Sequence, residues 1–107
     1  MTNEEAYMLV YGSNMDMPID QVLEILSNVN NYEDEPEALD NLTFFVIKDL
    51  YNKDIDFEQL TEDELDQVIC DKCNLLIMDK TFDNLVKKGV LERLIDGDGN
   101  FSYRKVV

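Results

Sequence analysis

The feature that most constrains the fold is a cluster of turn-forming residues near the C-terminus, Asp96-Gly97-Asp98-Gly99-Asn100. Short runs of strand-like composition flank it, and this pattern predicts a β-hairpin that pairs residues 90–95 with residues 101–106. Upstream, residues 61–88 have the apolar spacing of helices. An order of helix, turn, helix and hairpin leaves few architectures open to this part of the chain.

Helix starts can be read from capping signals. The pattern T-x-x-E occurs at Thr2 and again at Thr61, and Pro18 and Pro36 suit the first position of a helix. Around residues 71–74 the apolar periodicity breaks, so we expect a turn there, and Gly89 ends the last helix. The predicted helices are 3–11, 18–29, 36–51, 62–72 and 75–88.

Apolar residues at helical spacing predict the core. The expected inward-facing residues are Ile19, Val22, Leu23, Leu26, Val29, Leu39, Leu42, Val46, Leu50, Leu65, Val68, Ile69, Phe82, Leu85 and Val86. A chain of 107 residues is long enough for one such core. We therefore expect a single domain, 1–107, with an acidic helical segment, 1–53, followed by a second segment, 54–107.

The charge is strongly negative and unevenly distributed. The formal net charge is −15; residues 1–60 hold 14 acidic and 2 basic side chains, whereas residues 61–107 hold 10 and 7. With 45% apolar residues, this charge does not indicate disorder. No apolar run approaches the roughly 20 residues that span a bilayer. Glu4 and Glu5 at the start argue against a secretory signal, so a cytoplasmic protein is expected.

The junction between the last helix and the hairpin carries a resemblance. Leu85, Lys88, Gly89, Val90, Leu91 and Arg93 match a pattern like L-x-x-K-G-L-V-x-R. This segment resembles winged-helix (winged helix-turn-helix) transcription regulators of the multidrug-response type. The fold class expected from pattern and resemblance together is mainly α with a C-terminal β-hairpin, in which a winged-helix-like segment follows the acidic helices.

The resemblance implies DNA binding, with a recognition helix in the major groove and a wing on the backbone. The matching basic positions are Lys80, Lys87, Lys88, Arg104 and Lys105. Carboxylates interleave with them at Asp79, Asp83, Asp96 and Asp98. Because affinity for DNA comes largely from neutralised phosphates, an acidic wing tip opposes this role.

The turn Asp96–Phe101 is similar to the centre of a calcium-binding EF-hand loop. In that alignment Leu94 takes the first ligand position and Lys105 the last, where a carboxylate and a bidentate Glu are required. We expect a hairpin turn and no calcium binding.

Cys70 and Cys73 have the spacing C-x-x-C. Half of a zinc site shared between two chains and a redox pair are both compatible with this spacing. The chain has no His and no second cysteine pair, so it cannot complete a zinc site alone. The third interpretation, two small side chains on the buried face of a helix, is the one we adopt.

Enzymatic chemistry has little support in this chain. It contains no His, no G-x-S-x-G elbow and no phosphate-binding loop, and its carboxylates are too numerous for any pair to stand out. We expect no catalytic residues, no metal and no cofactor.

The leading hypothesis is a small acidic protein that binds a basic or nucleic-acid-handling protein, as a phage or mobile-element inhibitor, adaptor or structural component would. Electrostatic steering favours such pairs. The alternative is a winged-helix DNA-binding regulator, which dimerisation through the apolar residues of 39–50 would assist. An enzyme is the last-ranked alternative, which a bound metal or a deep polar pocket would favour. The predicted partner-binding residues are Glu33, Asp34, Glu35, Glu37 and Asp40.

Overall fold

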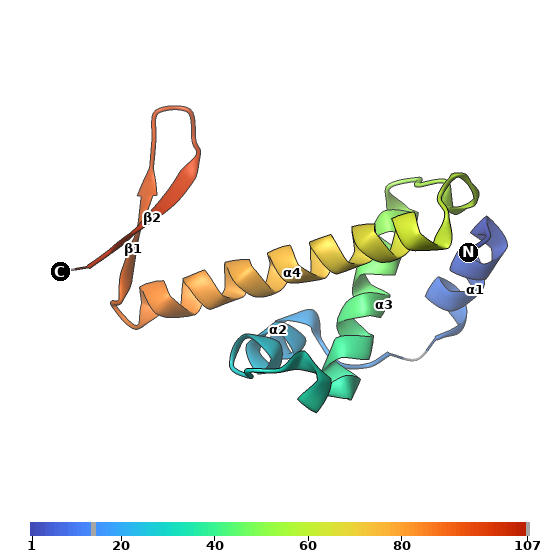
Figure 1. Cartoon of the computed structure of the whole chain (residues 1–107), viewed down its shortest axis with the longest axis horizontal. Helices are drawn as coiled ribbons and strands as arrows, with labels where there is room; N and C mark the ends of the chain where they lie inside the picture. The colour runs from blue at the N-terminus through green and yellow to red at the C-terminus, as the bar shows by residue number, and fades with distance from the viewer. Residues whose placement is uncertain (14, 107) are drawn as a thin grey trace.

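The computed structural model describes residues 1–13 and 15–106. They form a mainly helical chain that ends in a two-stranded antiparallel hairpin, as the sequence predicts (Figure 1). The molecule is elongated, 51 × 34 × 22 Å, with α1 and the hairpin at opposite ends. The elements are α1 (Asn3–Gly12), α2 (Ile19–Ser27), η1 (Tyr32–Asp34), α3 (Pro36–Asn52), η2 (Phe57–Gln59), α4 (Glu62–Lys87), β1 (Leu91–Ile95) and β2 (Phe101–Lys105).

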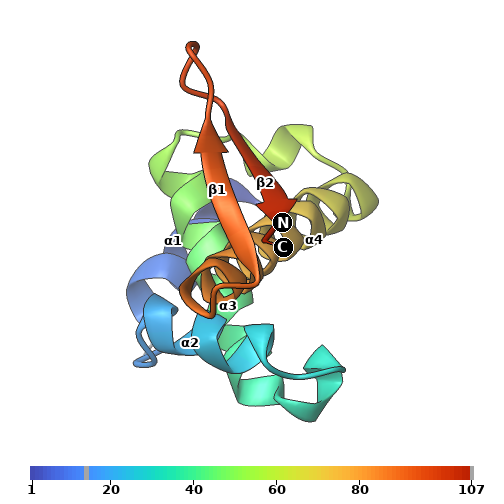
Figure 2. The ribbon, with the colours of Figure 1, turned by 90° about the vertical axis from the view of Figure 1, so that its left-hand side faces the viewer.

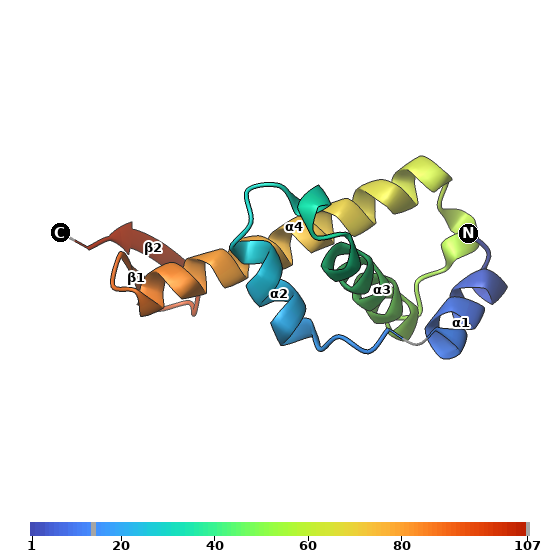
Figure 3. The same ribbon diagram turned by 90° about the horizontal axis from the view of Figure 1, so that it is seen from below.

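A bundle of α1, α2, α3 and the first two thirds of α4 contains the core (Figure 3). Both predicted capping boxes form: Thr2 pairs with Glu5, and Thr61 with Glu64. Pro36 occupies the first turn of α3 as expected. The largest side chains that are fully buried are Phe57, Leu26, Leu42, Val22 and Val46.

Two asparagines connect loops to the bundle. The buried Asn41 donates to the Glu37 carbonyl oxygen (2.8 Å) and accepts from the backbone N–H of Met17 (3.3 Å). Asn3 accepts from the backbone N–H of Phe57 (2.8 Å) and donates to Asp56 Oδ1 (2.9 Å). These bonds hold the α1–α2 connection against α3 and hold η2 against the start of α1.

The predicted turn at residues 71–74 is wrong, because α4 runs unbroken from Glu62 to Lys87. The range contains no Gly or Pro, and Asp or Asn in a helix interior costs only about 0.5 kcal/mol. Cys73 provides the physical reason. It is buried together with Leu65 and Ile77, at spacings of eight and four residues, so it continues the apolar stripe across the predicted break.

The last third of α4, residues 79–87, extends beyond the bundle core. Phe82, Leu85 and Val86, predicted to face the core, are half-buried and are not among the residues that make up the core cluster. The predicted core residues of α2 and of the N-terminal half of α4 do lie in or against it. The difference follows from the length of α4, which carries these side chains away from α1 and α3 (Figure 1).

Gly89 reverses the chain between α4 and the hairpin. Its φ is +77°, in the left-handed region that favours glycine. The Gly89 N–H donates to the Val86 carbonyl oxygen (3.1 Å), and the Val90 N–H donates to that of Leu85 (3.0 Å). This is the Schellman arrangement, and it confirms the role expected of Gly89.

The hairpin pairs Leu91 with Lys105 at its base and Ile95 with Phe101 at its tip. It is one residue shorter at its base than predicted, although the Val106 N–H still donates to the Val90 carbonyl oxygen (3.0 Å). Figure 1 shows the hairpin at the end of α4, apart from the bundle, and Figure 2 views the molecule from the hairpin end. The radius of gyration of 16.2 Å therefore exceeds the about 13 Å of a compact chain of this length.

Candidate protein interface

The five predicted partner-binding carboxylates lie together, on η1 and the first turns of α3. Glu33, Asp34, Glu37 and Asp40 are exposed and Glu35 is half-buried. Asn31 caps η1 by accepting from the Glu33 N–H (3.1 Å). Within the described residues, none of the five forms an ion pair, so their charges face solvent. We call Glu33, Asp34, Glu35, Glu37 and Asp40 the acidic cluster.

The charges of the chain separate between the bundle and the hairpin end. Residues 1–78 hold 19 acidic and 3 basic side chains, whereas residues 79–107 hold 5 and 6. The boundary at residue 78 falls inside α4. The bundle is thus strongly negative, and the hairpin end is close to neutral.

A cluster of three tyrosines, which the sequence analysis missed, lies at the other end of α3. The rings of Tyr7 and Tyr11 on α1 have centroids 4.7 Å apart, and Tyr51 on α3 lies 6.3 and 6.1 Å from them. Tyr7 is 51% exposed and Tyr11 66%. Tyrosine is enriched at protein interfaces. The spacing of four between Tyr7 and Tyr11 was the available signal, because it places both rings on one helix face.

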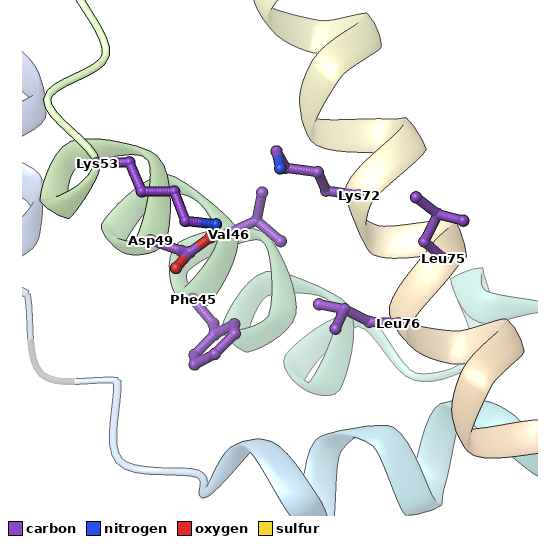
Figure 4. Close-up of a pocket in the computed structure, with 7 residues that line it drawn as sticks. All are labelled: Phe45, Val46, Asp49, Lys53, Lys72, Leu75 and Leu76. Carbon is purple, nitrogen blue, oxygen red and sulfur yellow. Dashed lines mark hydrogen bonds and ion pairs between the residues drawn. The ribbon is translucent and has the colours of Figure 1, made fainter. Parts of the chain in front are cut away.

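A groove of about 310 Å³ lies between α3 and α4 (Figure 4). Its apolar wall includes Phe45, Leu75 and Leu76. Two cations border it: Lys72, and Lys53, whose Nζ lies 2.9 Å from Asp49 Oδ2. In Figure 4 the side chains of Lys72 and Leu76 project from α4 toward α3. We call this site the α3–α4 groove.

Two of the five basic residues tied to the DNA-binding alternative, and the neighbouring Arg93, have carboxylate partners. Lys80 Nζ lies 3.3 Å from Glu24 Oε2 on α2, and Arg104 lies 2.5 Å from Glu92 across the hairpin. Arg93 is hydrogen-bonded to Asp83.

The remaining three candidates, Lys87, Lys88 and Lys105, are exposed near the base of the hairpin. Lys87 and Lys88 occupy the end of α4, and Lys105 lies opposite Leu91 in the strand register. The seven C-terminal cations thus divide between internal ion pairs, the α3–α4 groove and this small group.

The interpretation of both cysteines as buried is half wrong. Cys73 is buried, but Cys70 is exposed, and the Asn74 amide donates to its sulfur (3.5 Å). On a helix, positions three apart are offset by about 60°, so the narrow buried stripe of α4 covers only one of them. Burial, with the neighbouring Cys70 as a smaller cause, raises the pKa of the Cys73 thiol to about 11. At neutral pH Cys73 is therefore a protonated core residue and a poor nucleophile.

The carboxylate of Asp96 accepts hydrogen bonds from the backbone of the hairpin turn. Asp96 Oδ1 accepts from the backbone N–H groups of Asp98 (2.9 Å) and Asn100 (3.0 Å). These bonds, chiefly the one from Asn100, hold the pKa of Asp96 below its usual range. The absence of calcium binding here stays a prediction. Across residues 1–13 and 15–106, no three His, Cys, Asp or Glu side chains are placed to hold a metal ion.

No family model, curated protein or solved structure matches this chain. In the described part of the chain, no helix has the length and apolar character required to cross a membrane.

Proposed function

We propose that this protein is a non-enzymatic interaction protein whose acidic bundle binds a partner protein with a basic surface. The acidic cluster carries the proposal. It presents carboxylates from two consecutive elements, with no cation of the described chain bound to them. A surface of one sign of charge speeds encounter with a complementary partner and disfavours partners of like charge.

The tyrosine cluster supports the same role with a different kind of contact. Exposed carboxylates steer association, but most of the affinity of an interface comes from a few aromatic or arginine anchors. Tyr7 and Tyr11 are more than half exposed and restrain each other through ring contact. The acidic cluster and the tyrosine cluster lie near opposite ends of α3, a separation of about 25 Å for a 17-residue helix. A partner that covers both contacts most of one side of the bundle.

The proposed location of this protein is the cytoplasm. For a chain encoded by a phage, that location is the cytoplasm of the host cell. The exposed free thiol of Cys70 supports a reducing compartment, because such thiols are oxidised elsewhere.

Binding of DNA by a winged-helix regulator is the second candidate. It is favoured by the group of Lys87, Lys88 and Lys105, which lies at the helix-to-hairpin junction that carries the family resemblance. Three cations neutralise few phosphates, and the net charge of −15 repels the duplex. We therefore rank this role second.

The experiment is capture of partners from the native cell by the tagged protein, followed by mass spectrometry, with salt steps during elution. A parallel capture uses the variant Glu33→Lys/Asp34→Lys/Glu35→Lys. The proposal expects proteins with basic surfaces that elute at moderate salt and are depleted in the variant capture. Nucleic acid alone in the wild-type eluate, or proteins retained equally by the variant, would reject it.

A further inference from the structure

The tip of the hairpin presents an exposed apolar pair. Ile95 and Phe101 lie directly opposite each other in the register and are 66% and 62% exposed. Tyr103 is two residues from Phe101, so it shares this face of the hairpin, and its ring is stacked on Phe82 of α4. The face that α4 covers near the base therefore continues to the tip, where the Arg93 guanidinium carbon lies 5.4 Å from the Phe101 ring centroid and most of the surface of Ile95 and Phe101 stays exposed.

Charges at the tip are negative. Asp96 and Asp98 adjoin the apolar pair in the turn, and both are exposed. Asp96 is used within the turn, whereas the Asp98 side chain makes no hydrogen bond or ion pair among the described residues. The tip thus combines two exposed apolar side chains with the carboxylate of Asp98, which has no partner among the described residues.

The α3–α4 groove has the complementary character. Residues 1–78 contain only three Lys or Arg side chains, namely Lys48, Lys53 and Lys72. Lys53 and Lys72 border the groove, and Lys48 borders an adjacent hollow that shares Phe45 with it. Asp49 also lines the groove and pairs with Lys53, so Lys72 is the groove cation that has no ion-pair partner among the described residues. The cations of an otherwise acidic bundle are therefore gathered around one apolar depression, in which Leu75 is 57% exposed.

We propose that the hairpin tip of one copy of this chain docks into the α3–α4 groove of a second copy, and that the two copies exchange tips in a two-fold dimer. Ile95 and Phe101 cover Phe45 and Leu75, and Asp98 approaches Lys72. In its own chain the hairpin lies beyond the C-terminal end of α4, whereas the groove residues of α4 end at Leu76 (Figure 1). Reciprocal exchange limits the assembly to two copies, because each copy contributes one hairpin tip and one groove and both are then occupied.

Charge complementarity selects this occupant. Two chains of net charge −15 repel each other, so a contact between copies is favourable only where cations meet carboxylates at short range. The groove is the place on residues 1–78 where lysines gather, and the tip brings carboxylates with its apolar pair. The proposal does not depend on the proposed function, because the acidic cluster forms no part of this contact.

The first test is the molar mass in solution, measured by sedimentation at concentrations up to about 1 mM. At this concentration a dimer with a weak dissociation constant is still populated. The wild-type chain of 12.5 kDa is expected to approach twice that mass. Ile95→Lys at the tip and Leu75→Glu in the groove should each be monomeric. Met8→Lys is the matched control, since Met8 is 64% exposed on α1, and it should remain dimeric.

Mixing the two defective variants makes the test specific. A copy with Leu75→Glu keeps a normal tip, and a copy with Ile95→Lys keeps a normal groove, so the mixture should recover the dimer mass. In that heterodimer the second contact joins the two substituted positions, where the introduced lysine and the introduced glutamate attract each other. A monomeric wild type at the highest concentration, or no recovery in the mixture, would overturn the proposal.

A charge exchange tests the register of the contact. Lys72→Glu and Asp98→Lys should each weaken dimerisation at least about fivefold, as loss of a close charge pair does. The double variant should recover most of the loss, because the pair is restored with its signs reversed. Asp98 is exposed and Lys72 is half-buried, so both substitutions are compatible with the fold, and circular dichroism will verify folding. Additive weakening in the double variant would place Asp98 away from Lys72 and contradict the proposed docking.

Discussion

Phe82 on α4 and Tyr103 on β2 stack with ring centroids 4.8 Å apart and ring planes inclined by 29°. Arg93 extends this contact: its guanidinium carbon lies 5.6 Å from the Tyr103 ring centroid, and it is hydrogen-bonded to Asp83. An isolated two-stranded hairpin is only marginally stable in water. The orientation of the hairpin on α4 therefore depends on this small group of side chains.

Replacing Phe82 with Ala should loosen the hairpin while leaving the bundle folded. Loss of the ring contact removes about 1 kcal/mol, so amide hydrogens of β1 and β2 should exchange roughly fivefold faster. The thermal midpoint of the helices should change little, because Phe82 lies outside the core cluster. Amide exchange followed by NMR measures both. Tyr11→Ala, an exposed aromatic on α1, is the control and should leave hairpin exchange unchanged.

The two cysteines should react very differently. In the native protein at pH 8, iodoacetamide should modify the exposed Cys70 and spare Cys73, whose raised pKa and burial keep it a shielded thiol. Because the folded pKa of Cys73 lies above the unfolded value, its contribution to stability is complete below the unfolded pKa. That contribution is lost as pH rises toward about 11.

Denaturant unfolding at a series of alkaline pH values measures the contribution of the Cys73 thiol to the free energy of unfolding. Cys73→Ala should lose stability less steeply than wild type between pH 9 and 11. Cys70→Ala serves as the matched control and should fall between wild type and Cys73→Ala, close to wild type, because Cys70 is the smaller cause of the raised pKa of Cys73. Equal slopes for wild type and Cys73→Ala would show that burial of Cys73 does not perturb its ionisation.

Asp96 should titrate below the usual range of an aspartate. The backbone N–H groups of Asn100 and Asp98 donate to its ionised form, which lowers its pKa in the folded state. Stability therefore depends on pH in one direction. The Asp96 carboxylate stabilises the turn fully above the pKa of the unfolded state, and this stabilisation is lost as pH falls through the lower pKa of the folded state. Carbon-13 NMR of the carboxyl group gives the midpoint. A midpoint at or above that of an unstructured peptide would contradict the turn geometry.

Duplex DNA should bind no more tightly than about 1 μM near physiological salt, without sequence preference. Lys80, Arg93 and Arg104 lie against carboxylates of the same chain, which leaves Lys87, Lys88 and Lys105 to meet phosphates. Fluorescence anisotropy across random and selected duplexes measures the affinity. A nanomolar, sequence-specific footprint abolished by Lys87→Glu/Lys88→Glu would favour the regulator role.

The parts of the fold that local chemistry determines were predictable. Thr2 and Thr61 cap their helices by accepting a hydrogen bond from the backbone N–H of the glutamate three residues ahead. Pro36 starts α3, and Gly89 supplies the left-handed residue before the hairpin. Each of these depends on neighbours within a few residues. The acidic cluster was also predictable as exposed, because five carboxylates within eight residues cannot be buried together.

Features that depend on packing between distant segments were not predictable. A turn was predicted at residues 71–74 although Cys73 was expected to be buried, because the stripe that it forms with Leu65 and Ile77 depends on packing against the other helices. The contact of Tyr51 with Tyr7 and Tyr11 joins α3 to α1, and no local pattern reveals it. Likewise, Lys53 and Lys72 border one groove only because α3 and α4 pack together.

The association rate of the captured partner tests the central claim most directly. It is to be measured by stopped flow for wild type, for Glu33→Lys/Asp34→Lys/Glu35→Lys, and for the control Lys87→Glu/Lys88→Glu, at several salt concentrations. We predict that wild-type association slows as salt rises, that the acidic-cluster variant associates at least about tenfold more slowly at low salt, and that the control stays close to wild type. The opposite ranking, with the lysine variant slow and the acidic-cluster variant unaffected, would contradict the account.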